Sequence, residues 1–436
     1  MVPRDEAERR ARRFRIPLWR KQHLFLALAL VLGYVIWKSI TLLDVVPLVF
    51  RPAGATTAIN AETGPNAWAQ VRRSPRSTAY TADPAPFPRT VKWTFATAKP
   101  LISSPAVVAD RVYLTTEDGR TLALERQTGK VVWEYRSGWP SSSTPAVTPD
   151  LVISAVRPGM LVALDRATGA VRWERDMDSP ILSSPVVVDG TIYLGTAESQ
   201  LYALDAATGR PRWSFPTGAW VIAPVAYSDG TVAVAAQDSR MLIVGADTGR
   251  RQLLFDSGRS RRISGGPVIQ GDMVYFGTHD GSVWGIDRHA RTYPFGRTIL
   301  YWQTSLYIWG IGPQPVQKGS VWSTRIGGDL LHTPAVTPDT VYAVNKQGKV
   351  AALDAATGEE RWSTQVDTDI TSAPTVAGGT VLVGTWDGRV LGLDASNGER
   401  LWEFKTGGKI TASPVVAGDT IYVASNDGIL YALTAR

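Results

Sequence analysis

The chain has 436 residues, no cysteine, and 46 Lys and Arg against 39 Asp and Glu, for a formal net charge of +7. The lack of cysteine excludes disulfides, thiolate nucleophiles and Cys-ligated metal sites. Residues 1–22, predicted as a basic cytoplasmic tail, hold eight Lys and Arg against three Asp and Glu, so the other residues carry a net charge of only +2. No dense basic stripe is left for nucleic-acid binding.

The first predicted element is a transmembrane helix over residues 23–44. Leu24–Leu43 is a mostly apolar stretch of 20 residues, and a helix of about 20 residues rises about 30 Å, which matches the hydrocarbon core of a bilayer. Lys38 interrupts the stretch near its outer end, where the side chain can snorkel to the headgroups, and Tyr34 and Trp37 suit the interface. The basic flank predicts a bacterial cytoplasmic-membrane protein with a cytoplasmic N-terminus and the remainder extracytoplasmic, periplasmic or at the cell surface.

The alternative to a retained anchor is a cleaved signal peptide. Ala53-Gly54-Ala55 offers the small residues of a cleavage site. That site lies far beyond the apolar stretch, and the basic region is long for a signal peptide, so the sequence favours the anchor. Residues 45–90, rich in Pro, Ala and Thr from residue 51 onward, are predicted as an extended linker and leader before the first strand.

From residue 91 onward the chain repeats at a fixed step. Trp93 and Trp133 lie 40 residues apart, and the same step recurs to the end apart from a single excess of 29 residues. The eight positions in this series are Trp93, Trp133, Trp173, Trp213, Leu253 in place of Trp, Trp322, Trp362 and Trp402. A small residue followed by Pro marks the same eight units independently. Self-similarity at this period indicates a repeat architecture.

Residues 103–137 show what one repeat builds. Short β-branched runs alternate with turn sequences such as Asp118-Gly119 and Thr128-Gly129. Four strands of about five residues, with turn residues about every ten, predict a four-stranded antiparallel blade. The repeats contain no stretch with the 3.6-residue apolar period of a helix, so we expect no helix within them.

The two ends of the repeat region predict how the blades close into a ring. Residues 91–97 form a fourth-strand sequence that precedes any first strand, and residues 413–436 supply three strands and stop. Joined together they make an eighth blade, and the closure hides two sheet edges that would otherwise invite aggregation. The sequence therefore predicts an all-β, eight-bladed β-propeller over residues 91–436, preceded by one N-terminal transmembrane helix.

The last part of the repeat resembles the Ala-x-Asp-x-x-Thr-Gly-x-x-x-Trp signature of quinoprotein-type (PQQ-like) β-propeller repeats. One unit carries it in full as Ala203, Asp205, Thr208, Gly209 and Trp213. The unit with Leu253 departs, because Gly245 stands where the Asp is expected. The resemblance implies that the outer-strand tryptophans dock each blade on its neighbour, at Trp93, Trp133, Trp173, Trp213, Trp322, Trp362 and Trp402. It also implies that Asp and Thr-Gly hold the hairpin turn.

One insertion, residues 288–319, interrupts the unit that ends at Trp322. Six aromatic residues fall within 17 residues of this insertion and are the candidate contacts with a partner or a membrane interface: Tyr293, Phe295, Tyr301, Trp302, Tyr307 and Trp309. Long insertions on a rigid scaffold frequently carry function.

Three interpretations of the insertion remain open. It caps exposed propeller surface, it docks a partner protein through Trp and Tyr anchors, or it dips into the membrane interface beside the anchor helix. Residues 297–309 are too few to span a bilayer. Their apolar side chains scatter around a helical wheel, so an amphipathic helix is not expected.

The resemblance offers both an enzymatic and a non-enzymatic branch. Quinoprotein dehydrogenases hold their cofactor and a Ca²⁺ near the propeller axis, but this sequence contains no Glu/Asn/Asp set that matches those ligands. The four histidines, His23, His279, His289 and His332, show no metal-ligand spacing. We therefore predict no catalytic residue, no metal and no cofactor.

The better match is the non-enzymatic, BamB-like scaffold branch. We expect a single-pass membrane protein whose extracytoplasmic propeller organises a membrane or envelope complex by protein–protein interaction, without a nucleic-acid or small-molecule ligand. The departure from that branch is a transmembrane anchor in place of a lipid, since no cysteine exists to carry one. The alternative is a PQQ-dependent dehydrogenase-like or ligand-sensing subunit of an electron-transfer or transport complex.

Overall fold

The computed structural model describes residues 18–41, 67–258, 261–292, 295–313 and 315–435. The chain divides into two compact units. Pro47–Arg291 and Lys318–Arg436 form the propeller unit, and Met1–Val46 and Thr292–Gln317 form the helical unit.

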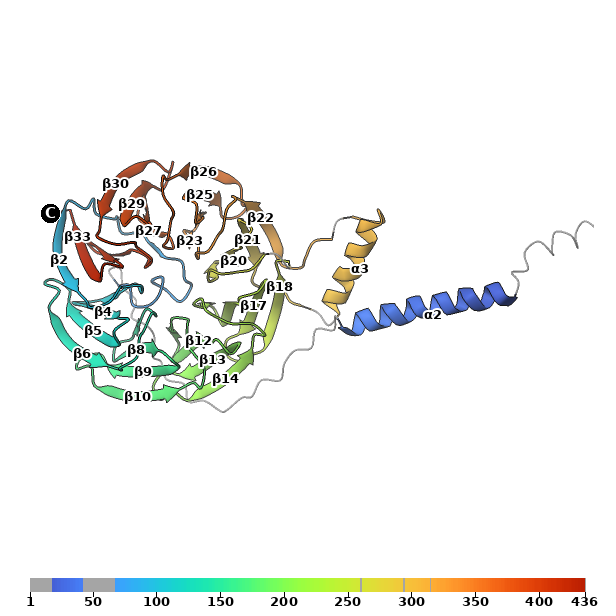
Figure 1. Cartoon of the computed structure of the whole chain (residues 1–436), viewed down its shortest axis with the longest axis horizontal. Coiled ribbons are helices and arrows are strands. Elements are labelled where there is room, and N and C mark those ends of the chain that lie inside the picture. The colour runs from blue at the N-terminus through green and yellow to red at the C-terminus, as the bar shows by residue number, and fades with distance from the viewer. Residues whose placement is uncertain (1–17, 42–66, 259–260, 293–294, 314, 436) are drawn as a thin grey trace, which may run out of the picture. The chain divides into compact units, whose positions relative to one another are not determined.

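Eight sheets in the described residues of the propeller unit follow one another around a ring, each with four antiparallel strands in sequence order apart from the closing blade (Figure 1). The first blade consists of β3 (Ala106–Val108), β4 (Arg111–Thr115), β5 (Arg120–Glu125) and β6 (Val131–Arg136), and the second of β7 (Ala146–Val147), β8 (Leu151–Val156), β9 (Met160–Asp165) and β10 (Val171–Asp176). The third consists of β11 (Val186–Val188), β12 (Thr191–Gly195), β13 (Gln200–Asp205) and β14 (Pro211–Pro216), and the fourth of β15 (Ala226–Ser228), β16 (Thr231–Ala235), β17 (Arg240–Gly245) and β18 (Arg251–Asp256). The fifth blade consists of β19 (Val268–Gln270), β20 (Met273–Gly277), β21 (Ser282–Asp287) and β22 (Ser320–Arg325), and the sixth of β23 (Ala335–Val336), β24 (Thr340–Val344), β25 (Lys349–Asp354) and β26 (Glu360–Gln365). The seventh consists of β27 (Thr375–Ala377), β28 (Thr380–Gly384), β29 (Arg389–Asp394) and β30 (Arg400–Lys405).

The ring closes as the sequence predicts. The eighth blade consists of β31 (Val415–Ala417), β32 (Thr420–Ala424) and β33 (Ile429–Thr434), with β2 (Thr90–Ala96) as its outermost strand. β2 runs antiparallel to β33, and Trp93 lies opposite Ala432. One feature was not predicted: β1 (Tyr80–Thr81) adds a parallel fifth strand to the seventh blade, beside β27.

Burial changes from the inner to the outer strands of each blade. Every residue of β8 and β12 is buried, whereas β10 alternates between exposed and half-buried positions. The middle strands are covered on both faces by neighbouring blades, and the outermost strand meets solvent at the rim. A blade cannot bury both faces alone, so the core lies between blades and depends on the whole ring.

The repeated tryptophans form the contacts between blades. Trp213, for example, donates its Nε1–H to the carbonyl of Ala246 in the next blade at 2.7 Å. Five further Trp indoles make the same bond to a carbonyl 33 residues later, at Arg126, Arg166, Ala206, Ala355 and Ala395. A register shift next to each Trp position, such as that between Ala203 and Leu204, turns the outer strand so that the ring faces its neighbour.

The unit that has Leu253 in place of the tryptophan makes a different contact with its neighbour. Leu253 has no indole to donate, and it is buried in an apolar cluster that includes Ile286 and Ala290. In the same cluster Phe255 packs edge-on to Trp284, with ring centroids 5.4 Å apart. Aromatic packing thus replaces the hydrogen-bonded Trp at this junction.

The helical unit contains two helices in its described part, α2 (Leu18–Thr41) and α3 (Gly296–Ile308). The predicted transmembrane segment, 23–44, overlaps α2, and residues 42–44 lie outside the described part. No helix formed by the described residues is long and apolar enough to cross a membrane, so the predicted span is not confirmed. α3 was not expected, and its apolar side chains, including Ile299, Leu306 and Ile308, are exposed rather than gathered on a buried stripe.

The glycine of the Thr-Gly turn is predicted to be fixed by the neighbouring tryptophan. Gly209 has φ +67°, and a Cβ added there would lie 2.7 Å from Cε3 of Trp173. We expect Gly209→Ala to lower the free energy of unfolding by about 2–5 kcal/mol, through left-handed strain plus overpacking. Urea denaturation followed by tryptophan fluorescence measures the loss.

Gly230→Ala is the matched control for this change. Gly230 has φ +72° but nothing within 4 Å of an added Cβ, so its cost is the backbone strain alone, about 1 kcal/mol. Equal losses in the two variants would show that the Trp173 ring does not constrain the turn.

Candidate functional site

The propeller axis is occupied by the chain's own leader. Residues 67–81, here called the axial strap, are largely buried; Trp68 is only 1% exposed. The strap lies at the centre of the ring (Figure 1) and accepts a hydrogen bond from the middle of the innermost strand in seven successive blades. The donors are the N–H groups of Val107, Val147, Val187, Tyr227, Ile269, Val336 and Val376, and the acceptors are the carbonyls of Trp68, Ala69, Pro75, Arg76, Thr78 and Ala79 and, for Val187, the Gln70 side chain.

These bonds satisfy one exposed edge in each blade. An innermost strand has no neighbour on its axial side, so its N–H groups would otherwise be buried without acceptors. In each of the seven blades, a single strap residue accepts the bond, with N···O distances of 2.7–3.0 Å. The axis of the propeller is therefore filled by protein backbone at the level of the strap.

A cation lies buried within the strap. Arg72 is 6% exposed, and its guanidinium donates to the carbonyls of Ser77, Pro334 and Pro374. Burial lowers the pKa of Arg72 to about 9, which still leaves it protonated at neutral pH. The two proline carbonyls belong to the small-residue–Pro steps of adjacent blades, so the cation joins those blades through the axis.

A histidine shares this environment. His332, two residues before Pro334, is half-buried, but the surrounding protein desolvates it and lowers its pKa to about 4. The charge of Arg72 acts in the same direction, and a backbone hydrogen bond with Ile370 opposes it. His332 is therefore neutral at pH 7, and the cation beside it is tied to carbonyls. This arrangement is suited to holding the axis together rather than to proton transfer.

The described residues do not fit the metal that accompanies a quinone in the dehydrogenases. Nowhere in the described ranges do three or more His, Cys, Asp or Glu side chains gather so that they could hold a metal ion.

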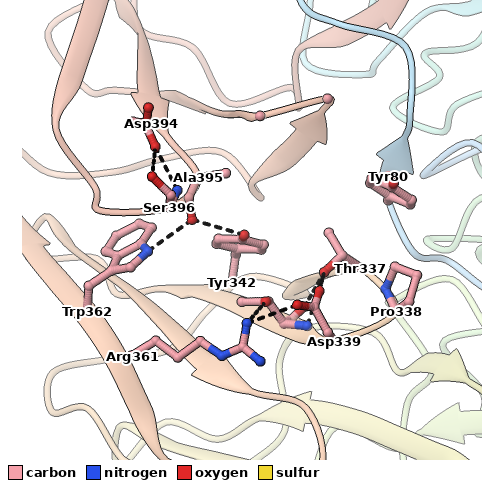
Figure 2. A pocket seen from close by; sticks show the side chains of 13 residues that line it. Tyr80, Thr337, Pro338, Asp339, Tyr342, Arg361, Trp362, Asp394, Ala395 and Ser396 are labelled. Carbon is pink, nitrogen blue, oxygen red and sulfur yellow. Dashed lines mark hydrogen bonds and ion pairs between the residues drawn. The ribbon is translucent and has the colours of Figure 1, made fainter.

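A cleft of about 620 Å³ opens between the sixth and seventh blades, where Tyr80 of the strap lies near three hairpin turns (Figure 2). Its polar side chains bind each other. Arg361 contacts Asp339 at 3.0 Å and Asp354 at 2.8 Å. Figure 2 shows Trp362 and Tyr342 both donating to the carbonyl of Ala395. The cleft is formed by the packing of neighbouring blades.

The aromatic residues predicted in the insertion lie on or next to α3, except Tyr293, which is outside the described residues. Phe295 is the residue before the helix and has φ +70°; Tyr301 and Trp302 pack edge-on, with centroids 5.0 Å apart. Tyr307 and Trp309 are exposed at the other end. The structure places Tyr301 against the N-terminal helix, since its hydroxyl lies 3.1 Å from that of Tyr34.

Three exposed tryptophans of the propeller were not predicted from the sequence as candidate contact residues. Trp139, Trp220 and Trp386 are 58%, 55% and 58% exposed. Trp139 and Trp220 lie between the last strand of one blade and the first of the next, and Trp386 lies between β28 and β29. In an up-and-down blade these connections emerge on the same face, here called the tryptophan face. The sequence does hold one indication that they differ from the core tryptophans, because all three fall outside the 40-residue series.

Comparison with known proteins places this propeller in a class. It is an eight-bladed propeller of PQQ-like repeats, and the family model described as outer membrane protein assembly factor BamB matches residues 87–182, 159–292 and 314–436. The chain belongs to this BamB family. The predicted resemblance is thereby confirmed. No curated protein sequence matches the chain.

Solved structures share the fold at low sequence identity. BamB from Moraxella catarrhalis is 20% identical, with a TM-score of 0.64, and the alignment covers 79% of this chain and 97% of that one. The quinohemoprotein alcohol dehydrogenase ADHIIG from Pseudomonas putida HK5 is 14% identical, with a TM-score of 0.68 and coverage of 85% and 80%. A europium-containing methanol dehydrogenase is 13% identical, with a TM-score of 0.68 and coverage of 86% and 99%. Both BamB and dehydrogenases therefore have this fold.

His332 predicts a pH dependence of stability. Its folded pKa of about 4 lies below the ordinary value of 6.5, so unfolding takes up a proton between these values and stability falls as the pH is lowered from about 6.5 to 4. The full effect is on the order of 2–3 kcal/mol at the low end of this range. Carboxylates with lowered pKa values, such as Asp354 with a pKa of about 2, also contribute to folding stability. They lose this contribution only when the pH falls below their ordinary pKa of 3.8.

We expect His332→Asn to remove this part of the pH dependence. The midpoint of urea unfolding, compared between pH 7 and pH 5, should shift less in the variant than in the wild type. In Arg72→Met, NMR titration of His332 should show a pKa raised towards 6.5, because a neighbouring positive charge has been removed. Identical pH profiles for the wild type and His332→Asn would contradict the assignment.

Proposed function

We propose that this protein is a non-enzymatic scaffold that binds a partner protein in a membrane or envelope complex through the tryptophan face of its propeller. The observation that carries the proposal is the exposure of Trp139, Trp220 and Trp386 on one face of a rigid ring in a BamB-family chain. Tryptophan is enriched at interface hot spots, because one ring buries a large apolar area at small entropic cost. Lys409 Nζ lies over the Trp386 ring, 4.5 Å from its centroid, and adds a cation to this surface.

We also propose that α2 anchors the propeller at the bacterial cytoplasmic membrane, with the propeller on the extracytoplasmic side. The support is the distribution of apolar side chains on α2. Leu26, Leu28, Leu30, Val31, Leu32 and Ile36 are all exposed, on every side of the helix. A helix that is apolar all round is stable when an apolar medium or a protein core surrounds it. The basic residues that precede it in sequence support the orientation.

Replacing the three tryptophans tests the partner surface. We expect Trp139→Ser, Trp220→Ser and Trp386→Ser in one chain to weaken partner capture at least tenfold, since a single interface hot spot contributes about 2 kcal/mol. Native co-purification from detergent, followed by titration of the captured partner, measures the loss.

The matched control replaces valines on outer strands. Val131 and Val171 are 47% and 45% exposed at the rim, and Val131→Ser with Val171→Ser should leave capture unchanged. Capture that is unaffected by the tryptophan changes would rule out the tryptophan face as the docking surface.

A dehydrogenase is the second candidate, because two quinone-class enzyme structures align over 85% and 86% of the chain with TM-scores of 0.68. We expect no dye reduction when the purified protein is incubated with the quinone, Ca²⁺ and a set of alcohols and sugars. Sustained turnover, absent when the quinone is omitted, would overturn the scaffold proposal.

A further inference from the structure

The helical unit joins two segments that are distant in sequence. α3 follows the third strand of the fifth blade, and α2 precedes the propeller, yet both fall in the same compact unit. The Tyr301 hydroxyl lies 3.1 Å from the Tyr34 hydroxyl. Lys38 Nζ lies 5.6 Å from the centroid of the Tyr301 ring and 5.2 Å from that of the Trp37 ring. These four residues form the aromatic–lysine cluster.

The composition of this cluster indicates where it is stable. Tyrosine and tryptophan rings prefer the boundary between water and hydrocarbon, and a lysine whose stem is apolar and whose ammonium is wet suits the same level. The cluster lies toward the C-terminal end of α2, after the apolar side chains from Leu26 to Leu32. The helical unit thus has an apolar segment followed by side chains typical of an interface.

The C-terminal end of α3 is apolar and uncovered. Ile308 and Trp309 are 73% and 71% exposed, and Ile311 is 59% exposed. Between Phe295 and Pro313 the sequence contains a single charged residue, Arg297. A segment with so few charges and such large exposed apolar groups is suited to an apolar surrounding rather than to water.

We infer that α3 is a lipid-binding helix that lies in the headgroup region of a phospholipid bilayer, held there by the aromatic–lysine cluster. The inference rests on the proposed anchoring by α2. Because α3 packs directly on α2 at the cluster, the medium that surrounds the apolar side chains of α2 also reaches α3. Ile308, Trp309 and Ile311 enter the boundary between headgroups and acyl chains. α3 thereby acts as a second membrane contact, supplied by the propeller's own insertion.

Site-specific labelling tests the depth of α3, and the lack of native cysteine makes each label unique. The full-length chain, with Leu30→Cys, Ile308→Cys or Val171→Cys, is labelled with an environment-sensitive fluorophore. It is reconstituted into vesicles of phosphatidylcholine and phosphatidylglycerol. Quenching is measured with lipids that carry a spin label either near the headgroup or deep in the acyl chain. Val316→Cys, at an exposed position after α3, is a second probe in case Ile308→Cys does not fold.

The expected pattern separates the two proposals. Position 308 should be quenched at least twofold more by the shallow than by the deep label, position 30 more by the deep label, and position 171 on the propeller rim by neither. Quenching at 30 but not at 308 or 316 would overturn the inference and leave the anchor intact, which would favour a protein partner for α3. Quenching at none of the positions would overturn the anchor itself. Stronger quenching by the acyl-chain label at position 308 than at position 30 would exclude an interfacial position for α3.

A second variant tests the cluster. Tyr301→Phe removes the hydroxyl that meets Tyr34 and keeps the ring. In the chain labelled at position 308, we expect the ratio of shallow to deep quenching to fall by at least one half, because α3 is no longer held at one depth. The thermal midpoint of the propeller serves as the folding control. An unchanged ratio would show that the cluster does not set the position of α3.

Discussion

The structure depends on the fact that a single four-stranded blade cannot bury both of its faces. Each blade needs a neighbour on each side, and six outer-strand tryptophans strengthen that contact by hydrogen bonding to the next blade, as Trp213 does to Ala246, whereas Trp402 makes no such bond. Since every core lies between blades, stability belongs to the ring and not to any unit within it. The unit with Leu253 shows that the requirement is burial: an aromatic cluster around Phe255 and Trp284 fills the same role.

The axial strap meets the same constraint at the centre. The inner strands have free edges that a ring of identical repeats cannot pair, because no strand lies beyond them. A non-repeated segment fills the axis, and Arg72 joins two blades through their proline carbonyls. A desolvated, neutral His332 shares this buried environment with Arg72.

The sequence predicted the parts of the structure that repeat, and it missed the parts that occur once. Eight tryptophan positions and the two incomplete ends were sufficient to predict eight blades and closure through residues 91–97. The strap has no period, and its contacts are made by backbone carbonyls, which no side-chain pattern records. The apolar side chains of α3 are exposed and not gathered on one buried stripe, so the helical-wheel argument had no pattern to detect. Trp139 and its counterparts were hidden among tryptophans that serve the core.

The strap also sets an order for synthesis. Residues 68–79 bond to seven blades, and residues 90–96 complete the eighth, so one short stretch near the beginning of the chain touches every sheet that follows. As the ribosome makes the chain from its N-terminus, the strap can pair with each inner strand in turn, but β2 must wait for its partner β33, which ends at Thr434. Its contacts span up to the whole length of the propeller, which makes closure slow. Until the ring closes, β2 and the inner-strand edges are open to mispairing.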